Sequence, residues 1–130
     1  MSARILIVDD NPINLKLACD VLEAYGYSIM RASDAEQAMA VLEGETPDLV
    51  LMDIALPGMD GLTLTRKLRV DPRFRELPIV ALTASTMKGD DTKAFDAGCD
   101  GHISKPIDTR RLAAQVEEFL RGRRRAGKPT

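Results

Sequence analysis

Five polar side chains that could bind a metal ion and a phosphoryl group follow short apolar stretches of the chain. Asp9 and Asp10 come after the first stretch, Asp53 after the third, Thr83 closes the fourth and Lys105 follows the fifth. Carboxylate oxygens bind hard cations, a lysine neutralises phosphoryl oxygens, and a hydroxyl donates hydrogen bonds to them. A carboxylate among such groups is equipped to accept a phosphoryl group, because positioning and charge neutralisation do most of the work in that reaction.

The apolar stretches are typical of buried β-strands, since they are short, rich in Ile, Val and Leu, and bounded by turn residues. We predict strands at Arg4 to Val8, Ser28 to Ala32, Asp48 to Met52, Ile79 to Thr83 and Gly101 to Ser104. Segments of helical period lie between them, which indicates βα units around a parallel sheet. The expected fold is a flavodoxin-like, doubly wound α/β domain, with a five-stranded parallel sheet in the order 2-1-3-4-5, flanked by five helices.

Local signals mark where several helices begin. Pro12 suits a first helical position, and Ser33 with Glu36 has the spacing of a capping box. Asp60 is expected to cap a helix that begins at Gly61, rather than to bind a ligand.

The predicted fold brings the polar side chains to one edge of the sheet. In open parallel sheets, ligands bind outside the carboxyl ends of the strands, where the strand order reverses. In the order 2-1-3-4-5, strands one and three are neighbours at that point, so Asp9, Asp10 and Asp53 should converge. Three carboxylates repel one another and require a cation, and oxygen ligands favour Mg²⁺, or Mn²⁺ in its place.

Composition limits the alternatives. A chain of 130 residues with 45% hydrophobic residues is about one domain long. It has no run of about 18 apolar residues and no recognisable export signal, so we expect a cytoplasmic protein without a membrane segment. Cys19 and Cys99 are expected to be ordinary buried thiols rather than a disulfide or a metal site.

The charge is unevenly distributed. The formal net charge is -2, but positions 121–130 hold five basic residues and no acid, which leaves 13 basic against 20 acidic residues elsewhere. We therefore expect no nucleic-acid partner for the acidic body. We divide the chain into a domain at residues 1–121 and a basic tail without regular structure at residues 122–130.

Five strings of sequence, in this order and spacing, resemble the signature of the response-regulator receiver domain. They are Ile-Leu-Ile-Val-Asp-Asp-Asn at 5–11, Leu-Val-Leu-Met-Asp-Ile at 49–54, Leu-Pro-Gly-Met-Asp-Gly at 56–61, Ala-Leu-Thr-Ala at 81–84 and Ser-Lys-Pro at 104–106. The resemblance extends from residue 3 to about 121. The pattern as a whole resembles stand-alone, single-domain regulators of the DivK and chemotaxis types. Asn11, Asn14 and the string Met-Lys-Gly-Asp at 87–90 are similar to those of stand-alone regulators of the DivK kind and of receivers in hybrid histidine kinases.

The resemblance implies a role for each acidic residue of the cluster. Asp53 matches the phosphoacceptor, Asp10 matches a direct metal ligand, and Asp9 matches a neighbouring acid that acts partly through water. Ala55 matches the position whose backbone carbonyl completes the metal site.

It also implies roles for residues of the last two strands. Thr83 matches the switch hydroxyl and Lys105 the phosphate-sensing lysine, and the bond between Lys105 and Pro106 is expected to be cis. His102 stands where the family usually has a Tyr or Phe that turns inward on activation. Two interpretations of His102 stay open: a switching residue, or a structural or exposed histidine.

The function that the resemblance implies is phosphorelay signalling. A histidine kinase or histidine phosphotransfer protein would donate a phosphoryl group to Asp53. Phosphorylation would then shift the surface of strand four, strand five and the helices after them toward a downstream protein target. We expect a monomer or weak dimer that is a phosphoacceptor and not an enzyme, apart from slow self-dephosphorylation. The positions of the first strand and last helix favour a stand-alone regulator, although a piece of a longer regulator would look the same.

Two other functions fit parts of the pattern. A phosphatase of the haloacid-dehalogenase type also uses a strand-end Asp with Thr, Lys and Mg²⁺, but it needs a second acid where this chain has Ala55. A flavodoxin-like redox module would share the fold, but the loop at 9–11 is acidic and would repel a flavin phosphate. Multiple turnover of phosphomonoesters would favour the first alternative, and tightly bound flavin the second.

Overall fold

The structure is a computed structural model that describes residues 3–54, 56, 58–83, 96–105 and 107–126, with side chains up to residue 121. The strands are β1 (Arg4–Val8), β2 (Ser28–Ala32), β3 (Leu49–Asp53), β4 (Ile79–Thr83) and β5 (Gly101–Ser104). The helices within the described residues are α1 (Pro12–Ala24), α2 (Ala35–Gly44), α3 (Gly61–Val70), the short 3₁₀ helix η1 (Pro72–Phe74) and α5 (Leu112–Ala126). We expected five helices, and the one between β4 and β5 falls mostly outside the described residues.

All neighbouring strands are parallel, and their order is β2-β1-β3-β4-β5. The predicted fold class and strand order are therefore confirmed. Four strands have the predicted bounds, whereas β3 begins and ends one residue later than expected. Asp48 does not join the strand, because its carboxylate accepts a hydrogen bond from the Arg4 backbone N–H (2.8 Å). Asp53 becomes the last residue of the strand and pairs with Leu82 of β4.

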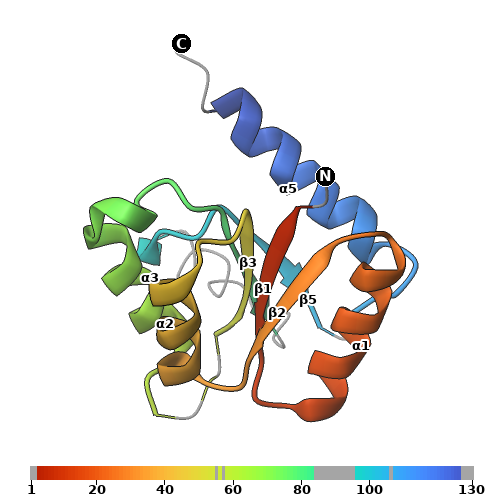
Figure 1. The fold of residues 1–130 in the computed structure, drawn as a ribbon, viewed down its shortest axis with the longest axis horizontal. Coiled ribbons are helices and arrows are strands. Elements are labelled where there is room, and N and C mark those ends of the chain that lie inside the picture. Colours follow the sequence, from red (N-terminus) through yellow and green to blue (C-terminus); the bar gives the residue numbers. More distant parts are fainter. Residues whose placement is uncertain (1–2, 55, 57, 84–95, 106, 127–130) are drawn as a thin grey trace.

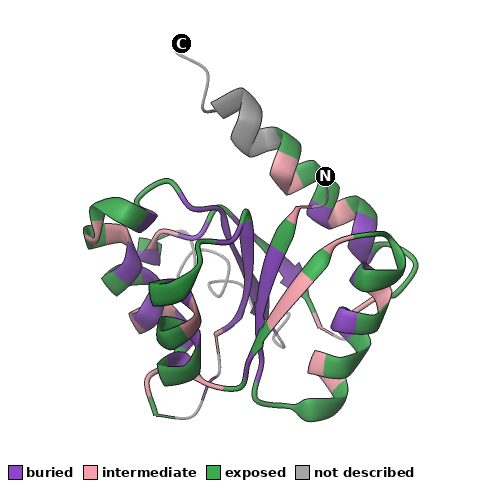
Figure 2. Cartoon of the chain, viewed as in Figure 1, coloured by how far each residue is buried: buried purple, intermediate pink, exposed green. Residues whose placement is uncertain are grey.

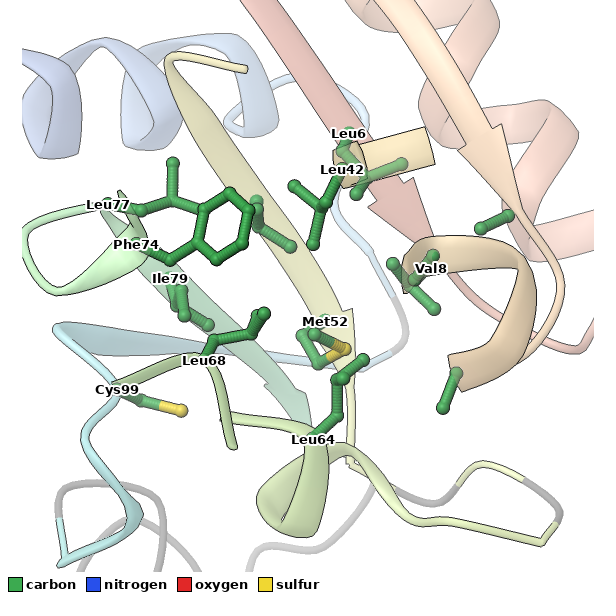
Figure 3. Packing of buried hydrophobic residues seen from close by; sticks show 14 of the residues in the cluster. Leu6, Val8, Leu42, Met52, Leu64, Leu68, Phe74, Leu77, Ile79 and Cys99 are labelled. Atoms are coloured by element: carbon green, nitrogen blue, oxygen red, sulfur yellow. The ribbon is translucent and has the colours of Figure 1, made fainter. Parts of the chain in front are cut away.

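Helices cover both faces of the sheet (Figure 1). On one face, α1 and α5 pack against alternate strand residues such as Ile7, Leu51 and Leu82. On the other face, α2 and α3 pack against the residues between them, including Val8 and Met52 (Figure 3). Every residue of β3 and every residue of β1 except Arg4 is buried, while the edge strand β2 is partly exposed (Figure 2). This two-sided burial explains why the strands have continuous apolar sequences instead of alternating ones.

The helix starts agree with the sequence signals except at α2. Pro12 begins α1, and Asp60 caps α3 by accepting from the Thr63 N–H (2.7 Å). The predicted Ser33–Glu36 capping box is wrong, because the cap of α2 is Asp34, whose carboxylate accepts from the Gln37 N–H (2.8 Å). Gln37 in turn accepts from the Ser33 N–H (2.9 Å). With the helix beginning one residue later, Glu36 falls on the second helical position and not on the third, where a capping box requires its acid or amide.

Both cysteines are buried and free, as expected. Among the described residues, no helix is long and apolar enough to span a membrane. Helix α5 continues to Ala126, beyond the end that we expected for the domain. The division of the chain at residue 121 stays a prediction.

Candidate metal and phosphoryl site

The predicted site residues lie together at the carboxyl edge of the sheet. Asp53 ends β3 and Thr83 ends β4, while Asp9 and Lys105 directly follow β1 and β5. Backbone hydrogen bonds continue past the strand ends, since the Asp9 N–H donates to the Ala32 carbonyl (3.1 Å) and the Lys105 N–H to the Thr83 carbonyl (2.7 Å). The backbones that carry these side chains are therefore fixed by the sheet.

The carboxylates of Asp9, Asp10 and Asp53 form one cluster. One oxygen from each lies within 4.8 Å of the others. Asp9 and Asp53 are only 1% and 4% exposed, whereas Asp10 is exposed. The backbone N–H of Asn11 donates to Asp9 Oδ1 (2.9 Å), which fixes the orientation of that carboxylate. The cluster thus has two buried acids and one acid at its opening.

Lys105 is the cation that faces the buried acids. Its Nζ donates to Asp53 Oδ2 (2.9 Å) and lies 3.1 Å from Asp9 Oδ2. The contact with Asp9 is an ion pair without hydrogen-bond geometry, and Asp9 Oδ2 is buried and accepts no hydrogen bond. A buried carboxylate oxygen without a donor costs free energy. Lys105 offsets part of this cost by its charge, but one lysine does not balance three carboxylates. A second cation would offset the remaining negative charge, and the all-oxygen donors suit Mg²⁺. The residues present therefore fit a hard metal ion.

The protonation equilibria reflect these contacts. Burial raises the pKa of the Asp9 carboxyl above its ordinary value, although the Asn11 hydrogen bond and Lys105 act in the opposite direction. Burial by itself would lower the pKa of Lys105, but its contacts with Asp53 and Asp9 raise that pKa overall. Lys105 is thus held in its charged form, while a proton binds Asp9 more readily than an ordinary aspartate.

The remaining predicted residues lie in different settings. Thr83 is buried, 2% exposed, and pairs with Ser104 across the last two strands. His102 is exposed on β5, so its side chain is outside the core and its switching role stays a prediction. Ala55 and Pro106 lie outside the described residues, and the predictions of a carbonyl ligand and a cis peptide bond stay open with them.

One feature of the site was not foreseen from the sequence. Gly61, the first residue of α3, approaches the backbone of Asp53 so closely that an added Cβ would lie 2.3 Å from the Asp53 carbonyl oxygen. In the sequence, this contact is marked only by a glycine at the start of a predicted helix. Many residue types occur at that position, so the glycine alone does not indicate a close approach.

Comparison with known proteins defines the class. The sequence matches the model of the response regulator receiver domain family over residues 5–117, so the chain belongs to this family. Its function is that of a receiver domain in two-component signalling, in which an aspartate accepts a phosphoryl group. This class is distinct from both alternatives, the phosphatase and the flavodoxin-like redox module.

Individual relatives agree with this assignment. The chain is 39% identical over 120 residues to the polar-differentiation response regulator DivK of Brucella ovis, and the match covers 92% of this chain and 98% of the relative. A CheY-like receiver domain protein from Methanospirillum hungatei superposes with a TM-score of 0.88 at 31% identity, covering 98% of this chain and 100% of the other. The receiver domain of a histidine kinase from Syntrophus aciditrophicus has a TM-score of 0.86 at 32% identity, covering 99% and 98%.

Proposed function

We propose that Asp53 is the phosphoacceptor of this receiver domain, and that a histidine kinase or histidine phosphotransfer protein is its donor. The observation that carries the proposal is the contact of Lys105 Nζ with Asp53 Oδ2 inside the cluster of three acids. Asp53 is the acid of this cluster that ends a central strand. Its strand lies between β1 and β4, and Asp53 itself pairs with Leu82 of β4, which gives the fixed backbone that a positioned nucleophile requires.

The proposed step is an in-line displacement at phosphorus. An oxygen of the Asp53 carboxylate forms a new O–P bond as the P–N bond of the donor phosphohistidine breaks. The imidazole nitrogen keeps the electron pair of the broken bond and takes a proton from solvent. Lys105, already beside Asp53, neutralises charge on the phosphoryl oxygens, and the hydroxyl of Thr83 donates to one of them.

We include Mg²⁺, or Mn²⁺, in the proposal. Asp9, Asp10 and Asp53 would hold it, together with the backbone carbonyl of Ala55 that the family resemblance implies. When bound, the ion offsets the negative charge that builds up on the transferring group. The buried Asp9 Oδ2, which accepts no hydrogen bond, supports this assignment.

Signal output is proposed to run through the last two strands. Thr83 ends β4, and its carbonyl accepts from the Lys105 N–H, so a movement of Thr83 toward a phosphoryl group also acts on the end of β5. We propose that this shift, with His102 as a candidate participant, is read by a downstream protein target. The protein would act in the cytoplasm as a monomer or weak dimer, and it would lose its phosphoryl group slowly instead of turning over substrates.

The central test is phosphorylation of Asp53→Asn. With an acyl phosphate donor and Mg²⁺, the wild-type chain should gain one phosphoryl group by intact mass, and Asp53→Asn should gain none. Asp60→Asn is the matched control, because it makes the same chemical change in a nearby acid while asparagine still caps a helix. Equal modification of the wild type and Asp53→Asn would show that another residue is the acceptor.

A further inference from the structure

The first turn of α3 packs directly against the backbone of Asp53. The Gly61 N–H donates to the Ile54 carbonyl (3.2 Å), and Gly61 is buried. A Cβ at Gly61 would lie 2.3 Å from the Asp53 carbonyl oxygen and 2.9 Å from the Ile54 Cα. The φ of Gly61 is outside the left-handed region, so glycine is needed here for close approach and not for its backbone conformation.

The Asp53 side of this contact cannot move away easily. β3 lies between β1 and β4, and Asp53 pairs with Leu82. The next peptide is also held, because the Ile54 N–H donates to the Leu82 carbonyl (3.3 Å). Displacing the peptide between Asp53 and Ile54 would therefore break pairing in the middle of the sheet.

The helix side of the contact is held by its own packing. Leu64 and Leu68 are buried and point into the core beside Met52 of β3 (Figure 3). The hydroxyl of the buried Thr65 donates to the Gly61 carbonyl (2.8 Å). The packing of Leu64 and Leu68 opposes a shift of the first turn away from the sheet, and the Thr65 hydrogen bond keeps that turn helical.

The far end of α3 is anchored by Arg69. Its Nε donates to the Gly98 carbonyl (2.8 Å) and its NH2 group to Asp100 Oδ2 (2.9 Å). Its NH1 group contacts three carbonyls of the loop before β4, those of Phe74, Arg75 and Leu77. An arginine with all these partners ties the helix to the segments that precede β4 and β5. The helix therefore cannot slide along its axis to make room for a side chain at Gly61.

We propose that Gly61 is a positioning residue for phosphoryl acceptance. Because it has no side chain, α3 packs against the 53–54 peptide, and this contact fixes the direction in which the Asp53 carboxylate leaves β3. The inference rests on the proposed role of Asp53 as the acceptor. A methyl group at Gly61 must displace the Asp53 peptide or the helix, and displacements near 1 Å slow positioned reactions by up to about a hundredfold.

The test compares Gly61→Ala with two control variants. Gly44→Ala adds the same methyl group at the end of α2, where no atom beyond the neighbouring residues and the backbone of its own helix lies within 4 Å. Leu68→Ala destabilises the same helix from its buried face without touching Asp53. Rate constants for phosphorylation by an acyl phosphate with Mg²⁺ are measured over a range of donor concentrations, in sucrose to favour the folded state, and divided by the folded fraction. Amide NMR shifts of residues 53 and 54 report the backbone position directly.

The expected result is a rate constant at saturating donor that falls at least about tenfold in Gly61→Ala, with shifted amides at 53 and 54. Both controls should stay within about twofold of the wild type. A wild-type rate constant in folded Gly61→Ala, an equal loss in Leu68→Ala, or a Gly61→Ala chain that stays unfolded in sucrose would overturn the inference. The proposed function is tested separately, by locating the phosphoryl group on the wild-type chain. If it is not on Asp53, the proposed function is wrong.

Discussion

The protonation state of the Asp9 carboxyl depends on its burial and on its contacts. One of its carboxylate oxygens accepts from the Asn11 N–H, while the other faces Lys105 without a hydrogen bond. Burial raises its pKa despite these contacts. An acid whose pKa is raised by folding is favoured in its protonated form, so its contribution to stability is complete below the ordinary pKa and is lost as pH rises through the raised pKa.

We predict that Mg²⁺ affinity falls as the pH is lowered through the raised pKa of Asp9, because protons and metal compete for the same carboxylate. Titrations of Mg²⁺ at a series of pH values, from neutral pH down through the raised pKa of Asp9, would measure this dependence. Asp9→Asn should bind Mg²⁺ more weakly at every pH and lose most of the pH dependence. Asp10→Asn serves as the control that weakens binding but keeps the dependence. The same slope in Asp9→Asn and the wild type would assign the competing proton to another group.

At the level of residues, the sequence was sufficient to predict the cluster of acids and its lysine. Asp9, Asp53, Thr83 and Lys105 could be placed because each ends or follows an apolar strand, and parallel strands bring such ends together. The contact of Gly61 with Asp53 could not be foreseen, since it depends on how closely a helix packs on a strand. No periodic pattern in a sequence reports that distance.

Among the elements, α3 is held at its start by Asp60. The Asp60 carboxylate accepts from the Thr63 N–H (2.7 Å), and this backbone hydrogen bond lowers the pKa of the carboxyl. The ionised side chain therefore contributes stability above the ordinary pKa of an aspartate, and that contribution is lost as pH falls through the lowered pKa.

We predict that Asp60→Ala lowers the free energy of unfolding by about 1 kcal/mol near pH 7, as expected for loss of a helix cap. The difference from the wild type should shrink at an acidic pH below the lowered pKa of Asp60, where the wild-type carboxylate is protonated as well. Urea unfolding at both pH values would measure it. Asp60→Asn retains a capping oxygen but lacks the charge, so it should lose less stability than Asp60→Ala near pH 7. If Asp60→Ala lost as much free energy of unfolding at the acidic pH as near pH 7, the charge of Asp60 would not contribute to stability.

Helices and strands could be predicted where the apolar pattern of the sequence matches the faces that are buried in the fold. The strands were found because burial on both faces gives each an unbroken apolar sequence. The predicted bounds were wrong where a side chain binds a backbone group. The Asp48 carboxylate accepts from the Arg4 N–H, and Asp48 lies just before β3 instead of within it. At α2, the helix cap is Asp34 and not Ser33. Two adjacent residues that can both cap a helix are not separable by spacing alone.

For the whole molecule, binding of Mg²⁺ to the folded state alone must increase stability. At a concentration one hundred times the dissociation constant, the gain is about 2.7 kcal/mol. We predict a corresponding rise in melting temperature for the wild type that is largely lost in Asp10→Asn. Because Asp10 is exposed and its replacement removes one of three repelling charges, this variant should melt no lower than the wild type in metal-free buffer with a chelator. An undiminished rise in Asp10→Asn would show that the ion binds elsewhere.

The position of Lys105 after the last strand determines when the site can form during synthesis of the chain. Asp9 and Asp53 are made early, but Lys105, which contacts both, follows the last strand of the sheet. A nascent chain that stops before β5 therefore has two acids at its sheet edge and lacks their basic partner. Assembly of the acceptor site is thereby coupled to completion of the sheet, so the ribosome must release nearly the whole domain before a phosphodonor meets a competent aspartate.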